Sequence, residues 1–132
     1  MSAENQYIDL FPDKEVCGKF KKYGMFEKSH FVWTLSEDVP QKRDHASKYY
    51  DVTTFLPAPL TDEIIPGLPK DLKDNEDDTI YEFNIYQSCD GWFTAELTKD
   101  FCRRYNNIQC CEKTPVMAAA ELCLKLKETG AF

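Results

Sequence analysis

The sequence has no apolar run long enough to cross a bilayer and no glycine-rich loop of the kind that holds phosphate groups. Its five glycines are scattered at positions 18, 24, 67, 91 and 130, whereas a nucleotide-binding loop needs several glycines at fixed, short spacing. A membrane-spanning helix would need about 20 consecutive, mostly apolar residues. We therefore expect a chain that does not span a membrane and that lacks the common phosphate-binding loops.

Catalytic signatures are also missing. The sequence contains neither the Gly-x-Ser-x-Gly turn that presents a nucleophilic serine nor the His-Glu-x-x-His pattern of zinc peptidases. His30 and His45 could each act as an acid or a base, but catalysis also needs a nucleophile and an orienting partner within reach. We predict that the protein is not an enzyme and has no catalytic residues.

Metal-binding patterns are weak. The six cysteines form no Cys-x-x-Cys pair, although structural zinc sites usually draw on that spacing. We instead expect Cys17 and Cys123 to be small core residues and the other cysteines to be ordinary thiols. The acidic stretch 74–78 lacks the central glycine of a calcium loop, and Ile85 stands where that loop needs a glutamate. We predict no metal site and no cofactor.

Negative charge is concentrated in one segment. The net charge is −7, and residues 61–82 contain eight acids against two lysines. An acidic chain gains nothing from the release of phosphate counterions, so we do not expect it to bind nucleic acid directly. A better partner is a protein with a basic or nucleic-acid-binding surface.

The composition indicates one folded domain of the α+β class. The 132 residues, of 15.3 kDa, suit a single domain over 1–132, and 42% hydrophobic and 14% aromatic content argues against disorder. We expect a small antiparallel sheet, with a central hairpin at about residues 79–99, packed against a C-terminal helix. A short N-terminal helix completes the predicted fold.

The N-terminal half consists of short predicted elements. A helix is expected over 13–23, with Asp13 as its N-cap and Gly24 ending it in the left-handed conformation. Pro66 lacks the N–H donor that a helix interior needs, so the helix that begins at Thr61 must be short, distorted or partly 3₁₀. The other predicted elements are a strand at 30–35, an exposed loop at 36–48, a strand at 49–55 and an exposed loop at 70–78.

The hairpin has a predicted register. Phe83 and Ile85 alternate with polar residues, and so do Ala95 and Leu97. A three-residue loop at 89–91 places both apolar pairs on one face, whereas a two-residue turn would place them on opposite faces. We therefore predict the three-residue loop, with its glycine in the left-handed conformation.

The C-terminal part contains the clearest helix. Thr114 is the expected N-cap, and Pro115 suits the first helical position because its missing N–H costs nothing there. A third strand is predicted near 108–111. One face of the helix is expected to be buried: Val116, Ala119, Leu122, Cys123 and Leu126.

The expected partner-binding residues combine acids with aromatics. Tyr86 and Trp92 fall on the hairpin face opposite the core in the predicted register. If this face is exposed, the two rings form an interaction patch, since large aromatics anchor interfaces. If another element covers this face, the two rings only pack against that element. The predicted partner-binding set is Asp71, Asp74, Glu76, Asp77, Asp78, Tyr86 and Trp92.

Four segments carry a family resemblance: the helix and turn at 15–26, the Pro-Ala-Pro-Leu-Thr-Asp-Glu segment at 57–63, the hairpin at 81–92 and the Thr-Pro-Val-Met-Ala-Ala-Ala-Glu-Leu segment at 114–122. Together they resemble a loose group of small uncharacterised proteins encoded by phages, prophages and other mobile elements, over most of the chain from about Asp13. Pro66 and the Cys110-Cys111 pair depart from that pattern. The resemblance implies a biological context, a bacterial host, and no site residues.

The leading hypothesis is an accessory protein of a phage or mobile element that binds a host protein. Its acidic surface could inhibit a defence nuclease or another nucleic-acid-binding complex. The N-terminus lacks the basic and apolar stretches of a secretory signal, so we expect the cytoplasm of the host.

Two alternatives stay open. One is a small-ligand binder or minor enzyme with a pocket between sheet and helix, marked by His30 or His45 meeting cysteine or carboxylate groups in a deep pocket. The other is a structural or assembly component.

Overall fold

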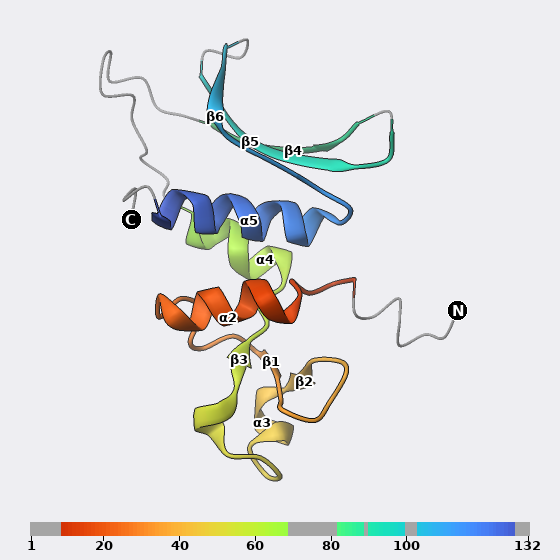
Figure 1. Cartoon of the computed structure of the whole chain (residues 1–132), viewed down its shortest axis with the longest axis vertical. Helices are drawn as coiled ribbons and strands as arrows, with labels where there is room; N and C mark the ends of the chain where they lie inside the picture. Colours follow the sequence, from red (N-terminus) through yellow and green to blue (C-terminus); the bar gives the residue numbers. More distant parts are fainter. Residues whose placement is uncertain (1–8, 69–81, 89, 100–102, 129–132) are drawn as a thin grey trace. The chain divides into compact units, whose positions relative to one another are not determined.

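A computed structural model describes residues 9–68, 82–88, 90–99 and 103–128 (Figure 1). The chain divides into two compact units, unit 1 at Met1–Ile64 and unit 2 at Ile65–Phe132. Each unit holds a three-stranded antiparallel sheet together with helices, which confirms the α+β class. The single domain expected from chain length stays a prediction.

Unit 1 begins with the predicted helix, α2 (Lys14–Lys22). The Asp13 carboxylate accepts a hydrogen bond of 2.9 Å from the Val16 backbone N–H, as an N-cap does. At the other end Gly24 has φ +68°, and the Met25 N–H donates to the Phe20 carbonyl at 2.8 Å. These contacts satisfy orphan backbone groups at both ends of the helix, so the predicted start and stop are confirmed.

The sheet of unit 1 has the order β2-β1-β3. Its strands are β1 (Phe31–Trp33), β2 (Gln41–Lys42) and β3 (Leu56–Pro57). In β1, Val32 and Trp33 are buried, and the indole N–H of Trp33 donates to the Pro12 carbonyl at 3.2 Å. The predicted strand at 30–35 is therefore present, although it is shorter than expected.

The predicted exposed loop at 36–48 is wrong in part. It contains β2 and the one-turn helix α3 (Arg43–Ala46), and both Pro40 and Ala46 are buried. Polar composition favoured a loop, but one apolar side chain at each end of this stretch is enough to bring it onto the sheet. The predicted loop at 70–78 lies outside the described residues.

The predicted strand at 49–55 is wrong. A 3₁₀ turn, η1 (Val52–Thr54), takes its place. The Asp51 carboxylate accepts from the backbone N–H and from the hydroxyl of Thr53, at 3.0 and 2.9 Å. Side-chain bonds of this kind compete with extended pairing, so one aspartate outweighs the β-branched residues that follow it.

The core of unit 1 includes two small clusters of side chains. One contains Phe11, Cys17, Trp33 and Ala58, and the other Val32, Ala46 and Phe55. The unit ends with α4 (Thr61–Ile64). Unit 2 begins with η2 (Ile65–Gly67), a 3₁₀ turn at the position of Pro66, as the missing proline N–H predicts.

Unit 2 is built on the sheet β4-β5-β6. β4 (Glu82–Gln87) and β5 (Phe93–Lys99) pair with Ile85 opposite Ala95 and Phe83 opposite Leu97. Gly91 has φ +88°, and the Ser88 N–H donates to the Trp92 carbonyl at 2.8 Å to close the loop. The predicted register, loop length and glycine conformation are confirmed.

The third strand and the C-terminal helix complete unit 2. β6 (Arg103–Glu112) is longer than predicted and pairs with β5. α5 (Pro115–Glu128) contacts all three strands, and the Met117 N–H donates to the Thr114 hydroxyl at 3.3 Å. The whole predicted face is buried, and Ala118, Ala120 and Leu124 are buried as well.

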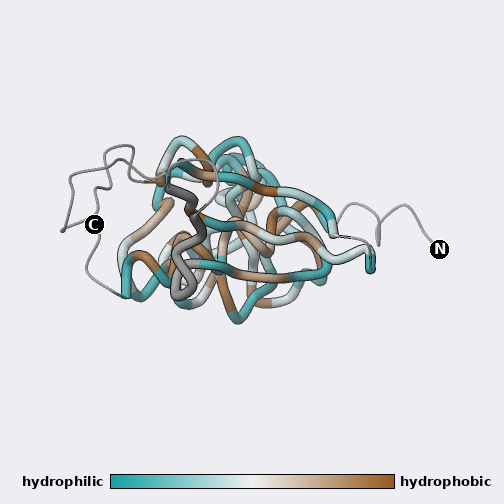
Figure 2. Tube along the Cα trace, turned by 90° about the horizontal axis from the view of Figure 1, so that it is seen from above, coloured by the Kyte–Doolittle hydropathy of each residue, from teal (hydrophilic) through white to brown (hydrophobic). Residues whose placement is uncertain are grey.

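Apolar residues recur at intervals along the elements rather than in one block, as the brown segments in Figure 2 show. No helix within the described ranges is both long and apolar enough to cross a membrane.

Candidate functional site

Of the residues predicted for partner binding, the structure describes Tyr86 and Trp92 but not the five acids. Asp71, Asp74, Glu76, Asp77 and Asp78 lie outside the described residues. Tyr86 is half-buried, whereas Trp92 is 39% exposed, with the Lys113 ammonium 5.8 Å from the centre of its ring. Thr94, which shares the face of Tyr86 in the predicted register, is buried. Trp92 is thus the exposed member of the pair, and its role in binding a partner stays a prediction.

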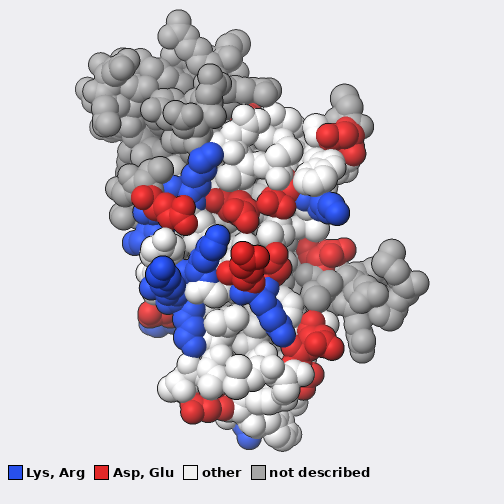
Figure 3. Space-filling view, in the orientation of Figure 1, with Lys and Arg blue, Asp and Glu red and all other residues white. Residues whose placement is uncertain are grey.

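Charge on the described surface is mixed. In Figure 3, both acidic and basic side chains lie on the face shown. A local concentration of one sign is therefore more informative than the net charge of the chain.

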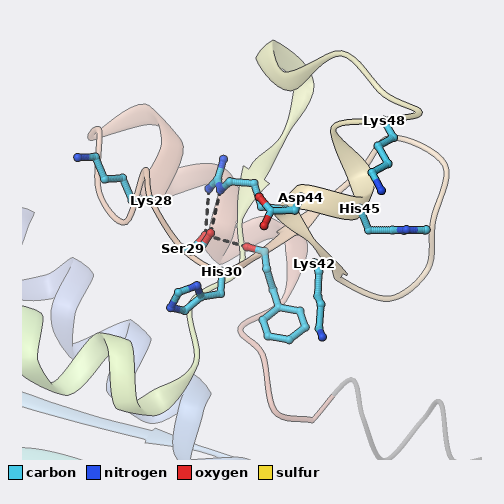
Figure 4. Close-up of a pocket in the computed structure, with 9 residues that line it drawn as sticks. Lys28, Ser29, His30, Lys42, Asp44, His45 and Lys48 are labelled. Carbon is cyan, nitrogen blue, oxygen red and sulfur yellow. Dashed lines mark hydrogen bonds between the residues drawn. The ribbon is translucent and has the colours of Figure 1, made fainter.

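Such a concentration surrounds a hollow of about 750 Å³ in unit 1 (Figure 4), which we call the basic hollow. Its wall contains four permanent cations, one carboxylate and three rings. The lining residues are Lys28, Ser29, His30, Phe31, Lys42, Arg43, Asp44, His45 and Lys48. A smaller hollow of about 330 Å³ shares Lys42 and His45 with it. The site thus brings together two segments, 28–31 and 42–48, that are separate in the sequence.

Arg43 holds these two segments together. Its Nε donates to the Ser29 carbonyl at 2.8 Å, and its Nη2 donates to the Ser29 hydroxyl at 3.2 Å. The Arg43 backbone N–H also donates to the His30 carbonyl at 2.8 Å. Ser29 is 2% exposed and donates its own hydroxyl proton to the Phe31 carbonyl at 2.7 Å. The guanidinium is therefore fixed in position before any ligand arrives.

The strand pairing places a ring beside a cation. Phe31 of β1 stands directly opposite Lys42 of β2 in the antiparallel ladder, and residues in this relation have side chains on the same face about 5 Å apart. The Phe31 ring also packs on Phe11, with ring centroids 5.1 Å apart. Phe31 thus takes part in the packing around Phe11 and also lines the basic hollow.

Glu63 stands next to the same wall. One of its carboxylate oxygens accepts from the His30 backbone N–H at 3.3 Å, and the other accepts from the Leu60 N–H at 3.1 Å. The second bond is the reciprocal half of a capping box at the start of α4. Glu63 therefore ties the His30 backbone to a helix end, and its charge is engaged by backbone donors.

Positive charge dominates the basic hollow. Lys28, Lys42, Arg43 and Lys48 face a single lining carboxylate, that of Asp44. Within the part of the chain that the structure describes, no ion pair or hydrogen bond is recorded for the three lysine ammonium groups. Figure 4 shows Lys28 and His30 on one side of Ser29 and Asp44, with Lys42, His45 and Lys48 on the other. This local excess of positive charge can attract an anion.

Three of the described thiols, those of Cys17, Cys110 and Cys123, are not candidates for nucleophilic chemistry. Burial raises the pKa of Cys17 and of Cys123 to about 12, and that of Cys110 to about 11. A thiol is nucleophilic as its thiolate, so these three are unreactive near neutral pH. Cys17 and Cys123 are fully buried, which confirms them as core residues.

The sequence named His30 and His45 separately but did not predict that they share a site. The pairing of the two-residue strand β2 with β1 brings them together, and so short a strand leaves no periodic pattern to recognise. The run Gln41-Lys42-Arg43-Asp44-His45 is the available signal, but its polar composition predicts part of an exposed loop.

Comparison with protein-family models, curated proteins and solved structures finds no match to this chain. The resemblance to phage and mobile-element proteins stays a prediction.

Proposed function

We propose that unit 1 binds a small anionic ligand, one that carries phosphate or carboxylate groups, in the basic hollow. The observation that carries the proposal is the fixed Arg43 guanidinium in a wall that also contains three lysines, whose ammonium groups have no recorded partner in the described chain. Binding sites for small molecules commonly measure about 300–1,000 Å³, and the basic hollow, at about 750 Å³, lies in that range.

The lining favours binding over catalysis. Ser29 is the hydroxyl in the wall, but it is buried and its proton is donated to the Phe31 carbonyl. A nucleophilic serine would instead need its hydroxyl exposed and bonded to a base. Asp44 and the two histidines lie in the same hollow, where without a nucleophilic hydroxyl they can orient a ligand by charge and hydrogen bonding.

The proposal is tested by measuring the affinities of inorganic phosphate and citrate for the full chain by calorimetry. The double variant Lys42→Ala/Lys48→Ala removes two cations of the hollow. Its matched control, Lys19→Ala/Lys22→Ala, removes two exposed lysines of α2 that do not line the hollow. Exposed charge pairs contribute about 0.2–1 kcal/mol each, so we expect the first variant to lose affinity about tenfold and the control to lose little.

Equal losses in the two double variants would contradict the proposal, because the effect would then follow from net charge alone. Absence of binding of either anion to the unaltered chain would contradict it as well.

Protein binding through the acidic segment, as an accessory protein of a phage or mobile element in the bacterial cytoplasm, is a second proposal. The exposed Trp92 ring supports it among the described residues. Its test is capture of a host protein by the chain and by a charge-reversal variant at Asp74, Glu76, Asp77 and Asp78. Capture that is unchanged at low salt would remove the electrostatic part of this proposal.

A further inference from the structure

We infer that the ligand of the basic hollow joins a phosphate group to a planar ring, as a nucleoside monophosphate does. This inference rests on the proposed anion binding and adds the chemical class of the ligand. It follows from the juxtaposition of Phe31, Lys42 and Arg43 in one wall.

Arg43 favours phosphate as the anionic group. A guanidinium has five N–H donors in a planar fork that matches phosphate oxygens. Ser29 takes two of these donors, through Nε and Nη2. No bond is recorded within the described residues for the other donors. The Ser29 contacts already restrict the side-chain rotation that an unrestrained arginine would lose on binding an anion. This pre-organisation reduces the entropy cost of holding an anion.

Phe31 supplies a surface for a planar ring. Its side chain is half-buried, lines the hollow and rests on Phe11. Bases stack on aromatic side chains in many sites that bind single nucleotides or single strands. Lys42, directly opposite Phe31 in the ladder, places a cation next to that surface, so one ligand can contact both groups.

The size of the hollow and the charge of the chain limit the ligand further. A hollow of about 750 Å³ has room for more than a single phosphate group. A nucleic acid would meet a chain with net charge −7, which opposes binding of a long polyanion. A mononucleotide carries few charges and fits inside the local basic wall.

The experiment compares four probes on the full chain by calorimetry: AMP, ribose 5-phosphate, inorganic phosphate and adenosine. We expect AMP to bind about tenfold more tightly than ribose 5-phosphate or phosphate, because only AMP offers both the phosphate and the ring. Adenosine, without the phosphate, should bind at least tenfold more weakly than AMP.

Two variants locate the ring contact. Phe31→Leu keeps an apolar side chain against Phe11 but removes the ring, and should lower the affinity for AMP about tenfold while leaving that for inorganic phosphate unchanged. Phe93→Leu is the control, since it makes the same change at a half-buried ring of unit 2 that does not line the hollow. It should leave both affinities unchanged.

The outcomes separate the two proposals. If AMP and ribose 5-phosphate bind equally to the unaltered chain, the ring inference fails while anion binding stands, and this comparison needs no variant to fold. If Phe31→Leu folds and binds AMP as tightly as the unaltered chain does, the Phe31 ring does not contact the ligand and the inference is contradicted. If no phosphate compound and no citrate binds, both proposals fail.

Discussion

Unit 1 and unit 2 each contain a three-stranded antiparallel sheet, but they build it differently. The strands of unit 1 are two or three residues long and those of unit 2 are six to ten residues long. Unit 2 covers its sheet with α5, a helix of 14 residues. Unit 1 relies on bonds from side chains to the backbone, such as Arg43 to Ser29 and Trp33 to Pro12.

The difference explains where a site can form. The long strands and the helix of unit 2 bury repeating apolar positions, together with the two polar side chains of Thr94 and Glu96. Short elements joined by polar bonds leave cations and rings along their edges, and the same bonds fix them in place. The basic hollow is therefore found in unit 1, whereas unit 2 is organised around packing.

The largest expected effect concerns the packing of unit 2. Leu122 is fully buried on α5, so Leu122→Ala should lower the free energy of unfolding by about 2–5 kcal/mol. The control is Leu35→Ala in unit 1, where the side chain is 76% exposed and the expected change is within about 0.5 kcal/mol. Urea unfolding measures both, and equal effects would contradict the burial that distinguishes these leucines.

A second prediction concerns alkaline pH and holds for both units. Burial raises the pKa of Cys17 in unit 1 and of Cys123 in unit 2 from an ordinary 9.0 to about 12. The folded state then holds each proton more tightly than the unfolded state. The stability from each neutral buried thiol is complete below pH 9 and is lost as the pH rises from about 9 towards 12.

Between pH 9 and 11 each thiol should steepen the loss of stability by about 1.4 kcal/mol per pH unit. Cys17→Ala and Cys123→Ala should each remove one such contribution from the pH dependence measured by urea unfolding. A variant whose slope matches that of the unaltered chain would show that the thiol at that position is not buried.

The smallest effects contrast two glycines. Gly91 in the hairpin loop has φ +88°, a conformation that other residues adopt with strain, so Gly91→Ala should destabilise unit 2 by about 1 kcal/mol. Gly18 lies inside α2, and a Cβ there would meet nothing within 4 Å. Gly18→Ala should therefore stabilise unit 1 by about 0.5–1 kcal/mol. Changes of the same sign in thermal unfolding would contradict this contrast.

The same two units differ in how far the sequence predicts them. The register of the hairpin follows from the alternation of Phe83, Ile85, Ala95 and Leu97, because a slip by one residue would place the two apolar pairs on opposite faces. The start of α5 followed from Thr114 and the proline after it. In both cases neighbouring residues contain enough information to fix the structure.

Unit 1 was harder to predict because its contacts are single and distant. Asp51 replaced an expected strand with a 3₁₀ turn through bonds to Thr53. Arg43 reaches Ser29, 14 residues earlier in the chain, and no periodic pattern announces such a bond. The histidines of the candidate site could be named from the sequence, but their meeting in one hollow with Phe31 and Lys42 could not.

The most direct test of the central claim is a nuclear magnetic resonance titration of the full isotope-labelled chain with inorganic phosphate, following every backbone amide. Binding in the basic hollow predicts that shifts concentrate at residues 28–31 and 42–48, while the amides of β4, β5 and α5 stay in place. Lys42→Ala/Lys48→Ala should reduce these shifts, and Lys19→Ala/Lys22→Ala should preserve them. Shifts centred on the strands of unit 2, or an unchanged spectrum at saturating phosphate, would contradict the assignment of anion binding to unit 1.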